Sequence, residues 1–254
     1  MAMTFDDPPL NEVALGRTFL PRPDFLVPHF GAFWREISDE FPKVAHAPPI
    51  FAAGEAFNES EGFFLPRIWM LSADSTMLVQ VQQNRFHFNW RQTDETKPYI
   101  RFPAVQTECV RLWEKFESFV LRMTGQPLQP VSMELTYVNL IPIDSDSSPF
   151  EVSSKTLQDC AWSTHLRFLP QPKTMAVSYA FDLPNGNGVL NASTALAQKQ
   201  DGTKILRLEL TVQGKPREGI LFEQWSDEAH NFLVEGFKDL TKPAMHAIWK
   251  LRGA

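Results

Sequence analysis

The chain has 254 residues, of which 43% are hydrophobic, so it can form one large domain or two small domains that are tightly joined. Its net charge is −6 and it contains no run of basic residues, which argues against bulk electrostatic attraction to nucleic acid. No segment approaches the roughly 18 consecutive apolar residues of a transmembrane helix. No signal peptide is recognised in Met1–Pro9, so we expect a cytoplasmic protein that does not bind a membrane.

In the first half of the chain, strand and helix signals follow one another. A strand is predicted over Glu12–Leu20. Apolar residues at the helical period predict a helix over Leu26–Phe41, which Pro42 ends because proline cannot continue a helix. A loop is expected over Ala45–Glu61. Three strands in a meander and a long helix follow, over Pro66–Leu71, Thr76–Gln82, Arg85–Arg91 and Pro103–Met123.

The second half repeats this order. A strand over Val131–Ile141, a polar loop over Asp144–Ser154 and a weak helix candidate over Thr156–His165 are predicted. A meander of three strands follows over Thr174–Asp182, Val189–Lys199 and Ile205–Gln213, with glycine-containing turns between them. A helix capped by Ser226 comes next, and a short final helix follows Thr241.

These patterns predict an α+β fold made of two tandem β-α-β-β-β-α halves. The halves are residues 1–125 and residues 126–254, the second of which also carries the short C-terminal helix, and together they form one compact unit. We expect a largely antiparallel sheet with the long helices packed on one face. The alternative is a single α+β domain whose element order only looks periodic, since the two halves share almost no sequence identity.

The segment Arg85–Arg91 alternates polar and aromatic residues without a break. Successive side chains of a strand point to opposite faces, so Phe86, Phe88 and Trp90 share one face. We expect these three residues to be buried under the helix Pro103–Met123. The opposite face then carries a row of groups that form directional hydrogen bonds.

The polar row is the best candidate for a functional surface. With residues at the same alternation on other strands, the candidate binding residues are Gln80, Gln82, Arg85, His87, Asn89, Arg91 and Arg207. One interpretation is an open face that is merely solvated, which is the ordinary state of an antiparallel sheet with one face in water. The other is an open face that holds a protein partner or a small anionic ligand, because arginine pairs with carboxylate or phosphate in a bidentate way.

Motifs that would fix a chemistry are missing from the sequence. There is no phosphate-binding loop, dinucleotide fingerprint, His-Glu-x-x-His or Gly-x-Ser-x-Gly. The six histidines are scattered and the two cysteines, Cys109 and Cys160, are not paired in a Cys-x-x-Cys motif, so neither a metal nor another cofactor is expected. Two reduced thiols are the simplest interpretation of the cysteines. A nucleophile and base made of Cys160 and His165 is only weakly indicated. The missing motifs do not exclude catalysis, but they favour a non-catalytic role.

Several segments together resemble a sporadically distributed, functionally uncharacterised family of bacterial proteins of similar length. The resemblance covers nearly the whole chain and rests on Pro8–Val13, Phe41–Val44, Gln80–Arg91, Trp113–Phe116, Glu134–Asn139, Trp225, Ala229-His230, Phe237 and Met245–Trp249. The family supplies no established catalytic residues. The resemblance implies a bacterial or phage source, and its patchy distribution is typical of accessory genes on mobile elements, including toxin–antitoxin and phage-defence loci.

Three functional hypotheses follow. The first is a non-catalytic binding or accessory protein of a bacterial system, whose open polar sheet face holds a protein partner, a second copy or a small anionic ligand. The second is a small-molecule-binding protein or enzyme with a pocket between sheet and helices, in which His87 acts with Glu134 or Glu209 as acid and base. The third is a nucleic-acid-binding saddle, which the acidic net charge disfavours.

Overall fold

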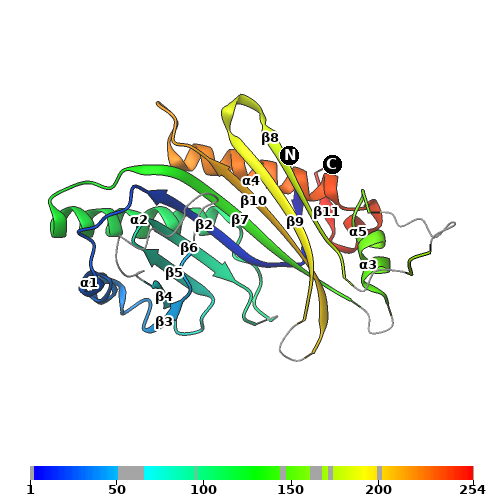
Figure 1. Ribbon diagram of the computed structural model, residues 1–254, viewed down its shortest axis with the longest axis horizontal. Helices are drawn as coiled ribbons and strands as arrows, with labels where there is room; N and C mark the ends of the chain where they lie inside the picture. The colour runs from blue at the N-terminus through cyan, green and yellow to red at the C-terminus, as the bar shows by residue number, and fades with distance from the viewer. Residues whose placement is uncertain are drawn as a thin grey trace. The chain divides into compact units, whose positions relative to one another are not determined.

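A computed structural model describes residues 3–50, 66–94, 96–143, 147–160, 168–170, 174–198 and 202–253. The chain divides into two compact units (Figure 1). Unit 1 comprises residues 1–12, 135–214 and 224–254, and unit 2 comprises residues 13–134 and 215–223. The strands β2 (Leu10–Phe19) and β7 (Pro130–Pro142) each contribute residues to both units.

The strands of unit 2 hydrogen-bond in the order β3-β4-β5-β6-β2-β7. The first four are β3 (Lys43–Ala47), β4 (Arg67–Leu71), β5 (Met77–Gln82) and β6 (Arg85–Arg91), and each pairs antiparallel with the next. The meander predicted from the sequence is therefore confirmed.

The aromatic face of this sheet is covered by α2 (Phe102–Thr124), and α1 (Val27–Ile37) packs against α2. Phe116 of α2 lies at the centre of an aromatic core, with its ring centroid 5.2 Å from that of Phe86 and 5.0 Å from that of Phe33. Phe86, Phe88 and Trp90 are buried, as predicted. Burial of such rings stabilises the unit because it removes apolar surface from water and allows edge-to-face contacts between the rings.

The segment 215–223 packs against α2 through a cation held between two rings. The guanidinium carbon of Arg17 lies 4.5 Å from the ring centroid of Trp113 and 3.9 Å from that of Phe222. Burial lowers the pKa of Arg17 from its ordinary value, and nearby carboxylates such as that of Glu223 oppose this effect. Arg17 thus joins β2, α2 and the segment 215–223 within unit 2.

The strands of unit 1 follow the order β2-β7-β10-β9-β8. They comprise parts of β2 and β7 together with β10 (Lys204–Gly214), β9 (Gly188–Gln198) and β8 (Ala176–Leu183), and β8–β9–β10 form an antiparallel meander. A 3-10 turn, η2 (Pro184–Gly186), links β8 to β9. A separate pair is formed by β1 (Thr4–Phe5) and β11 (Leu251–Arg252).

The helices of unit 1 are α3 (Pro149–Thr156), α5 (Pro243–Ile248) and α4 (Phe222–Leu240), of which the first two residues belong to unit 2. A Cβ on Gly236 of α4 would lie 3.2 Å from Leu190 Cδ2 and 3.8 Å from Leu210 Cδ2, so the helix packs closely on β9 and β10. Each unit thus has a long helix on one face of antiparallel strands, which confirms the α+β class. Among the described residues, no helix is both long and apolar enough to span a membrane.

Several element boundaries differ from those predicted. The helix α3 begins inside the expected loop Asp144–Ser154 and continues to Thr156, because Ser148 and Glu151 form a capping box at its start. The strand β3 occupies part of the expected loop Ala45–Glu61, and residues 51–65 lie outside the described residues. The long C-terminal helix begins at Phe222, and Ser226 is buried inside it instead of capping it.

The remaining predictions concern the second helix candidate and the repeated order of elements. The predicted helix Thr156–His165 is wrong over its described part, because α3 ends at Thr156 and Leu157 is extended and bridges to Thr241; residues 161–165 lie outside the described residues. The strand, helix, meander and helix recur along the chain as predicted, with β1, β3 and β11 as additional strands. The internal duplication behind this order stays a prediction.

The thiol of Cys109 is expected to be unreactive in the folded protein. Burial raises the pKa of Cys109 to about 12, and its Sγ donates to the Leu15 carbonyl at 3.3 Å. Only the thiolate attacks a disulfide reagent. In a Cys160→Ser variant at about pH 8, we expect an aromatic disulfide reagent to leave Cys109 unmodified until denaturant is added. Rapid release of the coloured thiolate from the native variant would contradict this arrangement.

Candidate functional site

A continuous polar row crosses the face of unit 2 that is opposite α2. Trp69 pairs with Gln80, and Gln80 pairs with His87, so these three residues form one line across β4, β5 and β6. Alternation along each strand places further polar side chains on this face. We call the whole set the polar cluster, and its members are Arg67, Trp69, Gln80, Gln82, Arg85, His87, Asn89, Arg91 and Glu134.

The polar cluster is buried, which corrects the expectation of an open face. The exposed fractions of its five most buried members lie between 2% and 7%, and these members are Gln80, Gln82, Arg85, His87 and Asn89. Neither a merely solvated face nor an open docking surface describes these five residues. Trp69, Arg67, Arg91 and Glu134 are half-buried.

Gln80 is the centre of the hydrogen bonds that order the cluster. Its Oε1 accepts from Arg67 Nη1 and from Trp69 Nε1, both at 2.9 Å. Its Nε2 donates to Asn89 Oδ1 at 2.7 Å. Both ends of the amide are thus satisfied, which a buried amide requires. The edge of the Trp69 ring is consequently fixed by the sheet itself.

The backbone of Ile50 closes the cluster beside Gln82 and Arg85. Ile50 N–H donates to Gln82 Oε1 at 2.8 Å, and the Ile50 carbonyl accepts from Gln82 Nε2 at 3.0 Å. The same carbonyl accepts from Arg85 Nε at 3.2 Å. The chain that follows β3 therefore approaches the polar face, and this approach contributes to the burial of the row.

His87 is the unusual member of the cluster. Its Nε2 is buried and has no hydrogen-bond partner among the described residues. Glu134 Oε1 lies 3.5 Å from this nitrogen, too far for a direct hydrogen bond. A Cβ on Gly16 would lie 2.5 Å from His87 Cδ2, so only glycine at this position lets the imidazole occupy its place beside β2. An unpartnered buried nitrogen costs about 1–3 kcal/mol, and a ligand that hydrogen-bonds to it would remove this cost.

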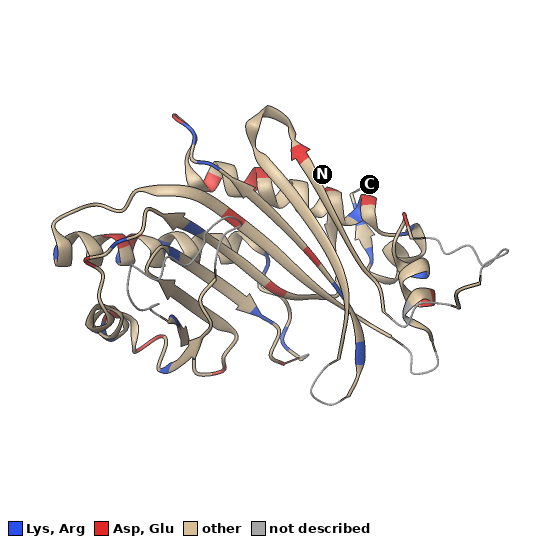
Figure 2. Cartoon of the chain, in the orientation of Figure 1, with Lys and Arg blue, Asp and Glu red and all other residues tan. Residues whose placement is uncertain are grey.

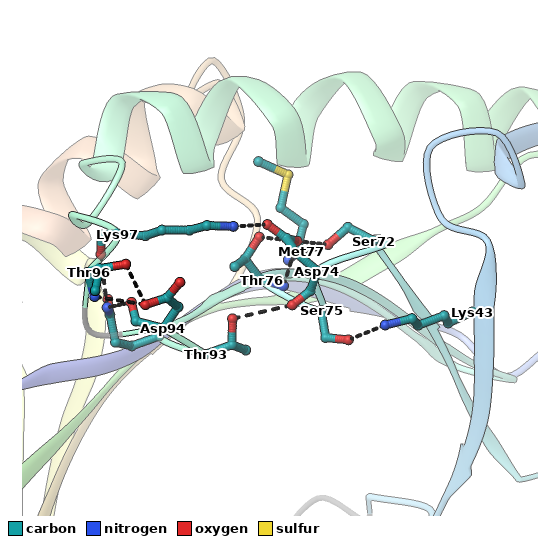
Figure 3. A network of polar contacts seen from close by, with 11 residues as sticks. Lys43, Ser72, Asp74, Ser75, Thr76, Met77, Thr93, Asp94, Thr96 and Lys97 are labelled. Carbon is teal, nitrogen blue, oxygen red and sulfur yellow. Dashed lines mark hydrogen bonds and ion pairs between the residues drawn. The ribbon is translucent and has the colours of Figure 1, made fainter.

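The position of Arg91 is fixed by the turn between β4 and β5. Arg91 N–H donates to the Thr76 carbonyl at 2.8 Å. In this turn, Asp74 Oδ1 accepts from Ser72 Oγ and Thr76 Oγ1, while Asp74 Oδ2 pairs with Lys97 at 2.8 Å (Figure 3). Hydrogen bonding from Lys97, followed by that from Thr76, holds the pKa of Asp74 well below its ordinary range. The network ties the turn to the residues that follow β6.

The described members of the polar cluster carry more positive than negative charge. Arg67, Arg85 and Arg91 contribute three guanidinium groups, whereas Glu134 contributes one carboxylate. Elsewhere on the described chain, Lys and Arg are interspersed with Asp and Glu (Figure 2). Guanidinium groups bind planar carboxylate or phosphate oxygens through two parallel hydrogen bonds. No group of three or more potential metal ligands occurs among the described residues.

Six of the seven residues predicted from the sequence come together in unit 2. Arg207 instead lies on β10 of unit 1, half-buried, where it forms an ion pair with Glu209. Of the two predicted acid–base pairs, the structure brings His87 and Glu134 together. Arg67 and Trp69 were not predicted, although the alternation of β4 and its pairing with β5 place them on the same face. No sequence signal identified Ile50, since its contribution comes from the backbone.

The chain was compared with family models, curated proteins and solved structures. No family model matches the chain, and no curated protein matches it. Among solved structures, the chain is similar to the crystal structure of DynU16, a protein in the dynemicin biosynthetic locus. The two share 13% sequence identity over 91% of this chain and 96% of DynU16, with a TM-score of 0.26.

Proposed function

We propose that this protein is a non-catalytic binding protein that holds a small anionic ligand on the polar cluster of unit 2. The observation that carries the proposal is the buried Nε2 of His87, which has no hydrogen-bond partner among the described residues and lies on the same sheet face as Arg91. Protein interiors rarely keep such groups unless they are paired or have a role. A ligand with an anionic oxygen supplies a hydrogen-bond partner for His87 and an acceptor for the guanidinium group of Arg91 on the same strand.

The burial of the cluster favours a small ligand over a protein partner. Five members are more than nine-tenths buried, so a protein surface cannot reach them without a change in the chain around Ile50. Small ligands, in contrast, are ordinarily enclosed by their sites.

Thermal unfolding with small anions tests the proposal. We expect benzoate, acetate or inorganic phosphate to raise the unfolding midpoint in a concentration-dependent way, since a ligand of the native state stabilises by RT ln(1 + [L]/Kd). In Arg91→Gln the increase should fall at least several-fold, because a charge-assisted hydrogen bond is lost. Arg122→Gln, at an exposed position on α2, is the matched control and should respond like the wild type.

His87→Phe separates ligand binding from stability. This variant loses the unpartnered nitrogen, but its larger ring must fit beside Gly16, so each response to an anion is measured relative to the midpoint of the same variant without ligand. Its response to the anions should be weaker. The proposal is wrong if none of the three anions raises the wild-type midpoint, or if Arg91→Gln and His87→Phe respond like the wild type.

A second candidate is general acid–base catalysis at the same site, favoured by the 3.5 Å approach of His87 Nε2 to Glu134 Oε1. Glu134→Gln distinguishes the two. For a binding protein, removal of the negative charge strengthens anion binding. For an enzyme, the variant accumulates unconverted substrate, which mass spectrometry of the purified protein would detect as a small molecule absent from the wild type.

A further inference from the structure

The side chain of Trp69 is arranged differently from the other large aromatic residues of unit 2. Phe86, Phe88 and Trp90 are buried on the helix side, whereas Trp69 is half-buried and lies on the polar face. An indole on a polar sheet face, beside buried amides and guanidinium groups, contributes little to the aromatic core. Its ring is a planar apolar surface within the polar cluster.

The two arginines near Trp69 do not cover its ring closely. The guanidinium carbons of Arg67 and Arg91 each lie 5.5 Å from the centroid of the Trp69 ring. In the packed sandwich of the same unit, the guanidinium carbon of Arg17 lies 3.9 Å from the centroid of the Phe222 ring. The value of 5.5 Å is near the outer limit of a cation–π contact, so the ring is approached by both cations without being tightly stacked.

The ring is also held in place before any ligand binds. Its Nε1 donates to Gln80 Oε1 at 2.9 Å, and Gln80 is itself held by Asn89 at 2.7 Å. A side chain that is already fixed loses little conformational entropy on binding. The combination is a rigid aromatic plane with a guanidinium group near it on β4 and another on β6.

We propose that the anionic ligand of this site carries a planar conjugated or aromatic group, which lies against Trp69 while its anionic group is held by Arg91. This inference rests on the proposed function and names the ligand class for the same polar cluster. Aromatic stacking stabilises such a pair beyond the contribution from the burial of apolar area. Guanidinium groups add planar contacts of their own as well as paired hydrogen bonds to a carboxylate.

Benzoate and cyclohexanecarboxylate provide a matched pair of probes. They carry the same charge and differ mainly in the planarity of the ring. We expect isothermal titration of the full-length protein to show benzoate binding about three- to tenfold more tightly, which corresponds to the stacking contribution. Trp69→Leu should remove this preference, whereas Trp69→Phe should retain most of it because a planar ring remains.

The control variant carries a substitution at a tryptophan outside the polar cluster. Trp34→Phe, which replaces a half-buried tryptophan on α1, should keep the preference for benzoate. Equal binding of the two probes, or a preference that survives Trp69→Leu, would overturn the inference about planarity while leaving anion binding intact. Failure of both probes and of phosphate to bind would overturn the proposed function as well.

Discussion

Gly16→Ala is expected to be among the most damaging single substitutions in this chain. A Cβ at this position would lie 2.2 Å from the Phe86 carbonyl oxygen and 2.5 Å from His87 Cδ2. The carbonyl belongs to the backbone of β6, so it cannot move away without disturbing the pairing of β2 with β6. We expect the free energy of unfolding to fall by about 3 kcal/mol or more, as for other overpacked core positions.

The measurement is a denaturant unfolding curve, and Gly31→Ala is the matched control. Gly31 lies in α1, and a Cβ there meets nothing within 4 Å. Alanine favours a helix over glycine by about 0.5–1 kcal/mol, so this control should be more stable than the wild type. If Gly16→Ala unfolded at the same denaturant concentration as the wild type, the close approach of β2 and β6 at Gly16 would be wrong.

The double variant Gly16→Ala with His87→Ala examines which contact dominates. Removal of the imidazole relieves the approach to His87 Cδ2 but leaves the closer approach to the Phe86 carbonyl. We therefore expect only partial recovery of stability. Full recovery would show that the imidazole, and not the backbone of β6, is what requires glycine at position 16.

Acid is expected to destabilise unit 1 through His230. Burial lowers the pKa of His230 to about 4, while the Asp227 carboxylate opposes this effect. The hydroxyl of Tyr137 lies within hydrogen-bond distance, 2.7 Å, of His230 Nδ1. In the unfolded chain, histidine takes up its proton near pH 6.5. The full stabilising contribution of the neutral imidazole is therefore present above about pH 6.5, and it is lost progressively as the pH falls towards 4.

The expected loss is about 3 kcal/mol at most between these two pH values, because each unit of difference in pKa corresponds to about 1.4 kcal/mol. His230→Gln keeps a hydrogen-bond acceptor for Tyr137 and does not titrate in this range. Denaturant unfolding at a series of pH values should show a smaller loss of stability in this variant. His46→Gln, at an exposed position on β3, controls for removal of a histidine. An unchanged pH dependence in His230→Gln would contradict the assignment to His230.

Much of the fold follows from local sequence patterns. The alternation in Arg85–Arg91 and the apolar stripe of Pro103–Met123 are enough to predict that the aromatic side of β6 packs under a long helix, as ring contacts between Phe86 and Phe116 show. Periodicity succeeds here because the two elements each bury one face. Periodicity does not predict α3, because the only sequence signal for this helix is the capping box of Ser148 and Glu151, which lies inside a polar segment.

The candidate site depends more on tertiary structure. The sequence by itself determined which residues of β5 and β6 share the polar face, since this follows from the two-residue period of a strand. Only the tertiary structure decided that this face is buried, because the hydrogen bonds of Ile50 to Gln82 and Arg85 and the close approach of Gly16 to His87 join residues about 30 to 70 positions apart. These contacts depend on the pairing of β6 with β2 and on the path of the chain after β3, and neither follows from the periodicity of a single strand.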